Sequence, residues 1–330
     1  MRTRHPYAAR LNSFAMRPEP TGRAGSGRLT TLELIDRAAT VPGLSAVDVN
    51  FPQQTEGIDL ADLRTRITDR GLRLNGLAMR YNDIPTFKRG AFTHPDAEVR
   101  RQAIDLTRRG IDASLEAGGT MLTIWPGQDG FDHPFQVDYA RMFDHEVEGL
   151  RAVAEHAPDM PVSVEYKPND PRSVMILPTV SATLLAIAEA GAPNLGVTLD
   201  FGHVLEADVS PAMAAAMVGR RSRLLGLHIN DGYGRRDDGL MPGAVNTVRT
   251  IELLRQLRLQ GFDGVIYFDT FPDVAQLDPV AEAAANVETM ELLWDALDRI
   301  PEPELAAALE RHDAVAAQRL VQRAILGRDR

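Results

Sequence analysis

Short apolar runs alternate with longer stretches of helical spacing along most of the chain. Each apolar run has the length and composition of a buried strand, and glycine, proline or polar residues separate it from the helical stretch that follows. The pattern predicts eight strands, at residues 8–14, 45–51, 72–79, 120–126, 161–165, 195–200, 224–228 and 264–269.

The stretches between these strands predict helices. They lie at residues 29–41, 60–71, 96–117, 136–156, 181–191, 210–219, 245–260 and 279–298. In the first of them Thr30 or Thr31 can act as N-cap, Leu34, Ile35 and Ala38 share one face, and Pro42-Gly43 ends the helix. The connection at residues 82–96 is expected to be a loop that could cover a pocket.

Regular alternation of strand and helix is the signature of parallel βα units. The chain lacks a Gly-x-Gly-x-x-Gly turn, so a (β/α)8 TIM barrel is favoured over a doubly wound α/β sheet. We expect one barrel over residues 1–300 and a C-terminal helical extension over residues 301–330, which packs on the helix layer or on a neighbouring subunit.

Composition narrows the function classes. The chain has 330 residues, 36 basic against 46 acidic, and a formal charge of −10, which argues against nucleic acid and anionic membranes as partners. Its zero cysteines exclude disulfides and thiolate metal sites. No apolar run has the roughly 18 to 20 residues of a membrane span, and no signal-peptide core follows the basic N-terminus. We expect a cytoplasmic protein that acts on a small molecule.

The last four predicted strands end in polar residues that suit a metal ion. These are Glu165, Asp200, His228 and Asp269. In a (β/α)8 barrel the C-terminal strand ends line the active site, so three carboxylates and one imidazole are expected to converge there. Carboxylates that close repel one another, and a divalent cation keeps them ionised. Mostly oxygen ligands favour Mn²⁺, with Mg²⁺ and Co²⁺ next and Zn²⁺ left open.

Each residue alone has an ordinary structural explanation. A strand-end aspartate often caps the next helix, and a lone histidine is more often a satisfied core residue than a ligand. Four such residues at equivalent positions of consecutive strands favour the metal site.

These motifs resemble the xylose-isomerase-like TIM barrels, a superfamily of sugar and sugar-phosphate isomerases and epimerases. The resemblance covers about residues 8–299, and its most specific segments are Glu165-Tyr-Lys167-Pro168, Asp200-Phe-Gly-His203, His228-Ile-Asn230-Asp231, Asp237-Asp238-Gly239-Leu240-Met241 and Tyr267-Phe268-Asp269-Thr270-Phe271-Pro272. The rhamnose-isomerase-like branch implies that Glu165, Asp200, His228 and Asp269 hold one metal. It also implies a second metal on His203 with Asp237 or Asp238, and Lys167 as a substrate-polarising group.

The resemblance implies a metal-dependent isomerase or epimerase of carbohydrate metabolism, which moves a proton or hydride next to a sugar carbonyl through an enediolate. Glu165 would be the base, with Lys167 or His203 polarising the oxygens. Asp269 replaces the proton-moving glutamate of the tagatose and psicose epimerase branch, which favours an isomerase over an epimerase. His145 is a candidate second acid or base. Candidate substrate-binding residues at the strand ends are Trp125, Phe14, Asn50 and Asn230.

A second activity stays open. The chain also resembles the catalytic subunits of C-glycoside deglycosidases, lyases that eliminate the aglycone from a 3-oxo-glycoside together with a small β-sandwich partner subunit. Otherwise we expect a homo-oligomer that acts on a free sugar or glycoside, because no Gly-rich phosphate cradle follows the last two strands. The acidic charge disfavours a DNA-repair endonuclease of the same fold.

Overall fold

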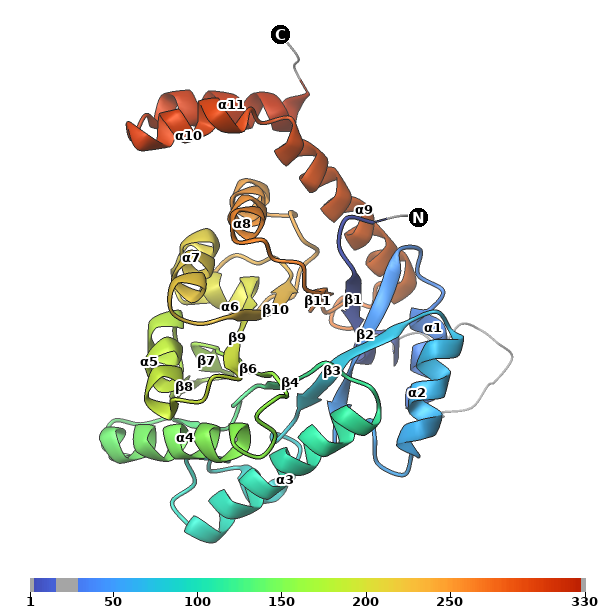
Figure 1. The fold of residues 1–330 in the computed structure, drawn as a ribbon, viewed down its shortest axis with the longest axis vertical. Coiled ribbons are helices and arrows are strands. Elements are labelled where there is room, and N and C mark those ends of the chain that lie inside the picture. The colour runs from blue at the N-terminus through green and yellow to red at the C-terminus, as the bar shows by residue number, and fades with distance from the viewer. Residues whose placement is uncertain (1–2, 16–28, 328–330) are drawn as a thin grey trace.

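Eight parallel strands close into a barrel in the computed structural model, which describes residues 3–15 and 29–327 (Figure 1). Their order around the barrel is β1-β11-β10-β9-β6-β4-β3-β2, and β1 pairs with both β2 and β11. The predicted (β/α)8 fold is therefore confirmed. The strands are β1 (Tyr7–Arg10), β2 (Leu44–Phe51), β3 (Arg73–Met79), β4 (Met121–Ile124), β6 (Val162–Glu165), β9 (Leu195–Asp200), β10 (Leu224–Ile229) and β11 (Ile266–Phe268).

Helices surround the barrel (Figure 1). In the first of them, Thr30 forms a capping box with Glu33, and Leu34, Ile35 and Ala38 are buried, as the sequence predicts. The outer helices are α1 (Thr31–Ala38), α2 (Leu60–Asp69), α3 (Ala97–Glu116), α4 (Tyr139–Ala154), α5 (Val180–Ala190), α7 (Pro211–Arg221), α8 (Thr247–Gln260) and α9 (Pro279–Asp298).

The first strand is shorter than predicted. It ends at Arg10, and a 3-10 helix, η1 (Leu11–Ala15), replaces the second half of the predicted strand 8–14. The hydroxyl of Ser13 donates to the carbonyl of Thr270 at 2.9 Å, which holds the chain where it turns across the end of the barrel. Apolar content alone did not distinguish this turn from a strand.

Several short elements lie between the main strands and helices. Helix α6 (Phe201–Glu206) begins directly after β9, with Asp200 as its N-cap. Strands β5 (Gly130–Phe131), β7 (Asn169–Asp170) and β8 (Ser173–Met175) form an antiparallel sheet in the order β5-β8-β7. This small sheet joins the loops that follow β4 and β6, so it fixes the backbone on one side of the barrel mouth.

The connection at residues 82–96 packs against helix α3. It contains the 3-10 helix η2 (Pro85–Phe87), and the ring centroid of Tyr81 lies 5.8 Å from that of Phe87 and 5.9 Å from that of Phe92. A cavity of about 280 Å³ lies between this segment and α3. None of the four strand-end residues predicted to hold a metal lines that cavity.

Two helices follow the barrel, as predicted. Helix α10 (Glu302–Glu310) and helix α11 (Ala314–Leu326) extend beyond the end of α9 (Figure 1). Arg255 on α8 pairs with Glu302 at 2.5 Å, and Arg299 donates to the carbonyl of Ala324 at 3.0 Å. The extension is thus attached to α8 and to the end of α9. In the described ranges, no helix combines the length and apolar character that a bilayer span requires.

One buried carboxyl group in the helix layer gives a stability prediction. Glu146 on α4 is fully buried and neither side-chain oxygen has a hydrogen-bond partner. Burial, with a contribution from Asp129, raises the pKa of Glu146 well above its usual value. A group whose pKa is higher in the folded than in the unfolded state contributes stability that is fully present below its unfolded-state pKa. That contribution is lost as the pH rises towards its folded-state pKa.

We therefore expect Glu146→Gln to gain stability relative to the parent protein as pH rises from 5 to 8. The gain has an upper slope of about 1.4 kcal/mol per pH unit, and urea unfolding at several pH values measures it. The matched control is Glu148→Gln, an exposed position on the same helix. Parallel pH curves for the parent and Glu146→Gln would contradict this assignment.

Candidate metal centre

The four predicted metal ligands converge at the C-terminal end of the barrel. Each of Glu165, Asp200, His228 and Asp269 offers one ligand atom within 4.8 Å of the others. Glu165 and Asp200 are the last residues of β6 and β9, and Asp200 is opposite His228 in the register of β9 and β10. Asp269 follows β11 directly. The strands therefore bring together residues that are up to about a hundred positions apart in the sequence.

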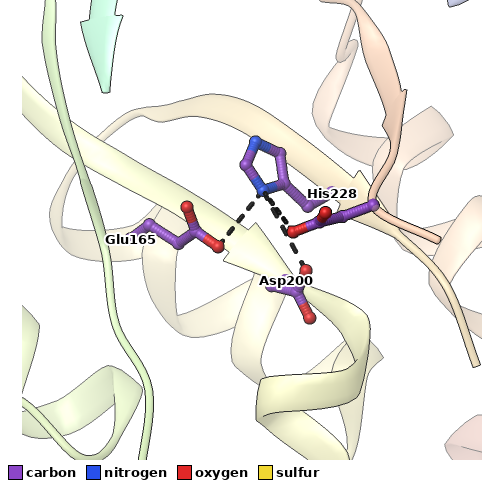
Figure 2. A group of neighbouring side chains, drawn as sticks. Glu165, Asp200 and His228 are labelled. Carbon is purple, nitrogen blue, oxygen red and sulfur yellow. Dashed lines mark ion pairs between the residues drawn. The ribbon is translucent and has the colours of Figure 1, made fainter. Parts of the chain in front are cut away.

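The imidazole of His228 lies between carboxylates (Figure 2). Its Nδ1 atom is 3.2 Å from Glu165 Oε1, 4.0 Å from Asp200 Oδ2 and 3.9 Å from Asp269 Oδ2. This nitrogen is buried, and its contact with Glu165 lacks hydrogen-bond geometry. A buried nitrogen without a hydrogen bond, aimed at three carboxylates, is the arrangement that a divalent cation would satisfy.

The charges of the cluster also fit a cation. Burial would lower the pKa of His228, but Glu165, Asp269 and Asp200 outweigh burial and raise it to about 9. Burial would raise the pKa of Glu165, but His228 and His203 lower it to about 2. Burial raises the pKa of Asp200 to about 7. The carboxylates are therefore stabilised by a nearby positive charge. Protonated His228 supplies that charge when no metal is bound, and a divalent cation would take its place.

His203 and Lys167 form a second group beside this cluster. His203 Nδ1 donates to the carbonyl of Tyr166 at 3.0 Å, and its Nε2 is 3.3 Å from Asp237 Oδ2. The same carboxylate oxygen accepts from Lys167 Nζ at 3.0 Å, and Lys167 also pairs with Asp170 at 3.0 Å. Burial would lower the pKa of Lys167, but Asp237 and Asp170 outweigh it and raise the pKa. The ammonium group therefore stays charged.

The structure separates the two aspartates that the sequence left as alternatives for a second metal. Asp237 faces His203 and Lys167, whereas Asp238 accepts from the backbone N–H of Tyr233 at 2.9 Å and from Arg236 at 2.9 Å. Asp238 thus stabilises its own loop. The ammonium of Lys167 already supplies a positive charge at Asp237.

Asn230 is hydrogen-bonded to two of the candidate metal ligands. Its Nδ2 donates to both carboxylate oxygens of Asp200 at 3.3 Å and to the carbonyl of Asp269 at 3.2 Å. Its Oδ1 accepts from the backbone N–H of Gly202 at 2.8 Å. Asn230 is fully buried. Asn230 was predicted to bind substrate, and the structure shows its buried side chain hydrogen-bonded to Asp200 and to the backbone of Asp269.

Trp125 and Asn50 lie on one side of the mouth and share a partner that sequence reasoning missed. The guanidinium of Arg80, which follows β3 directly, is 5.5 Å from the Trp125 ring centroid, and its Nε donates to Asn50 Oδ1 at 3.0 Å. Lys167 Nζ is 5.7 Å from the same ring. A Cβ atom on Gly127 would lie 2.2 Å from this ring, so only glycine allows the indole to rest there.

Phe14 and His145 are not part of this group. Phe14 is 0% exposed and belongs to the hydrophobic core, because the 3-10 helix after β1 turns its side chain inward. His145 lies on α4 beside a cavity of about 280 Å³ that Arg89 and Arg141 also line. None of the four candidate metal ligands lines this cavity. Burial lowers the pKa of His145, which leaves its imidazole neutral near pH 7.

Arg10 is a second basic residue that sequence reasoning missed. It ends β1, its Nε is 3.9 Å from Asp269 Oδ1, and its Nη1 is 3.2 Å from Asp273 Oδ1. For Arg80 the signal was available, because it directly follows the predicted strand 72–79, as the acidic residues end theirs. Arg10 lay inside the predicted strand 8–14, and only the earlier end of β1 brings it to the barrel mouth.

The protein is a closed (β/α)8 barrel with acidic groups and an imidazole at its C-terminal strand ends, and these groups could hold a metal. These features are typical of barrel enzymes that act on small molecules. Comparison with known families agrees, since the model of the family described as "Xylose isomerase-like TIM barrel" matches residues 35–310. The chain belongs to this family.

The similar proteins include a xylose isomerase and sugar epimerases. The xylose isomerase of Thermus thermophilus is 26% identical over 268 residues, which cover 76% of this chain and 68% of the relative. An L-ribulose 3-epimerase structure aligns with a TM-score of 0.70 at 14% identity, covering 90% of this chain and 97% of that one. The structure of a 3-keto-D-glucoside 4-epimerase from E. coli aligns with a TM-score of 0.64 at 16% identity, covering 86% of this chain and 100% of that one. The last two likenesses show the fold.

Proposed function

We propose that this protein is a divalent-metal-dependent sugar isomerase that moves a proton from the carbon beside a sugar carbonyl to the carbonyl carbon. The cluster of Glu165, Asp200, His228 and Asp269 carries this proposal, because it concentrates three carboxylates and a buried nitrogen without a hydrogen bond at one point of the barrel mouth. The family and the likeness to the Thermus xylose isomerase support the reaction class.

The four residues would hold the metal, and we propose Mn²⁺ because hard oxygen ligands predominate. When bound, the cation supplies a Lewis acid that polarises the sugar carbonyl and stabilises the negative charge that develops on it. Asn230 holds two of the ligands in place through its hydrogen bonds to Asp200 and to the backbone of Asp269. The chain's own residues must then position the substrate and move the proton.

Glu165 is the proposed base. Its Oε1 faces His228 Nδ1, and its second oxygen can accept the proton from the carbon beside the carbonyl and return it to the neighbouring carbon. Lys167 stays charged and lies on the same side of the site as His203, through their shared contact with Asp237. We propose that Lys167 donates a hydrogen bond to the substrate oxygen whose negative charge grows as the proton leaves.

A C-glycoside deglycosidase is the second candidate. It begins with the same removal of a proton beside a ketone, and one observation favours it. The 3-keto-D-glucoside 4-epimerase shares this fold over 86% of the chain, so the barrel accommodates proteins that act on 3-keto-glycosides. Elimination of an aglycone would also need a group that protonates the leaving carbon.

The two candidates differ in what the purified chain does by itself. With Mn²⁺ and a panel of aldoses and ketoses in D2O, we expect interconversion by NMR, with deuterium entering the carbon that receives the proton. If that carbon instead keeps its original hydrogen, the result would indicate a hydride shift and contradict proton transfer through Glu165. No sugar interconversion by the chain alone, together with release of an aromatic aglycone from a 3-oxo-glycoside once a small β-sandwich partner subunit is added, would overturn the isomerase in favour of the deglycosidase.

A further inference from the structure

Arg80 holds its guanidinium at the barrel mouth with most of its donors unused. The residue is half-buried, and Nε donates to Asn50 Oδ1 at 3.0 Å. The guanidinium also lies over the Trp125 ring, 5.5 Å from its centroid. Throughout residues 3–15 and 29–327, neither Nη atom has a hydrogen-bond partner, and the side chain forms no ion pair. Two contacts therefore fix the group while its fork of N–H donors stays free.

The two other cations near the site are neutralised by carboxylates. Lys167 pairs with Asp237 and Asp170, each at 3.0 Å. Arg10 pairs with Asp273 at 3.2 Å and lies 3.9 Å from Asp269. Arg80 is different, because the described part of the chain provides no carboxylate within ion-pair distance of it. The Nη atoms of Arg80 are not among the buried polar atoms that lack a partner, so they are accessible to solvent and to an anionic ligand.

Arg80 lies on the reaction side of the barrel. It follows β3 directly, and Trp125 follows β4 directly, so both stand at the C-terminal end of the barrel, where the metal-binding candidates also lie. The Trp125 ring contacts Lys167 at 5.7 Å as well as Arg80. A substrate that reaches Lys167 therefore passes within reach of Arg80.

We propose that Arg80 binds a carboxylate of the substrate, which makes the substrate a sugar acid and not a neutral sugar. This inference rests on the proposed function and names its substrate class. The guanidinium fork can donate two parallel hydrogen bonds to a planar carboxylate, a geometry that an ammonium group does not offer. Asn50 and Trp125 hold the fork in one orientation.

A carboxylate fits better than a phosphate ester. A single guanidinium balances one negative charge, whereas a phosphate dianion needs more donors to compensate its charge. The nearest other cation on this side, Lys167, is already paired with two carboxylates, and these would repel a dianion. The site therefore matches a singly charged planar anion.

The test is binding to the Mn²⁺-loaded protein, which needs no turnover. Calorimetric titrations with D-glucuronate, D-glucose, D-galacturonate, D-galactose and D-glucose 6-phosphate give two matched pairs and a phosphate arm. We expect each uronate to bind at least about tenfold more tightly than its neutral sugar, and Arg80→Gln to reduce that ratio by about tenfold or more. Arg80→Lys should restore only part of it, because the charge returns without the fork.

Arg220→Gln, at an exposed position on α7, is the matched control and should leave the ratio at the parent value. Equal affinity for uronate and neutral sugar, an unchanged ratio in Arg80→Gln with native melting temperature, or tighter binding of the phosphate ester would each overturn the proposal. Failure of the proposed isomerase function would give a different result from failure of the Arg80 proposal. A protein that prefers uronates through Arg80 but interconverts no sugar would keep this subsite and lose the proposed reaction.

Discussion

Removal of the divalent metal with EDTA is expected to abolish turnover and to lower the melting temperature, and addition of Mn²⁺ should restore both. An ion that binds the folded state alone stabilises it by about 2.7 kcal/mol at a concentration one hundred times its Kd. For a protein of this size, that corresponds to a shift of roughly 4 °C. Differential scanning calorimetry with and without Mn²⁺ measures the shift, and a sugar interconversion assay measures the activity.

A matched pair of variants assigns the effect to the cluster. Asp200→Asn removes one ligand charge while keeping a similar shape, so it should lose most of the Mn²⁺-dependent shift. Asp144→Asn, at an exposed position on α4, should keep the whole shift. If chelation changes neither the melting temperature nor the activity, the proposed metal site is wrong.

Glu165→Gln is expected to keep the fold and to lose turnover by about a thousandfold or more, since the change removes the proposed base and one ligand charge together. Steady-state kinetics at saturating Mn²⁺, with the Mn²⁺ affinity of the variant measured separately, divides the loss between the two roles. Glu148→Gln is the surface control. A near-normal kcat in Glu165→Gln would assign proton transfer to another residue.

The arrangement of the candidate ligands could be predicted from the sequence for a physical reason. A carboxylate at the end of a buried apolar run is costly unless it binds something, so Glu165, Asp200 and Asp269 were conspicuous. The parallel barrel then required that all strand ends meet on one face. Asp200 also shows that the two explanations for such a residue are compatible, because it caps α6 through His203 N at 3.0 Å while facing His228.

Other features depend on contacts that no local pattern encodes. Asn230 has the same appearance in the sequence whether it binds a sugar or supports Asp200, and only the packing of β9, β10 and β11 separates the two. Phe14 was predicted at a strand end, but the chain turns into a 3-10 helix and buries the ring. The strands of the small β5-β8-β7 sheet are two or three residues long, too short for any periodicity.

The hydrogen bonds of Asn230 also bear on how fast the site fills. They join the end of β9, the start of α6 and the residue after β11 through one buried amide. If the proposed metal binds here, its ligand set is already assembled, and loading would require no folding of the barrel mouth. Uptake would then be limited by how quickly the hydrated ion loses water, and it would be slowest for Mg²⁺, which dehydrates reluctantly.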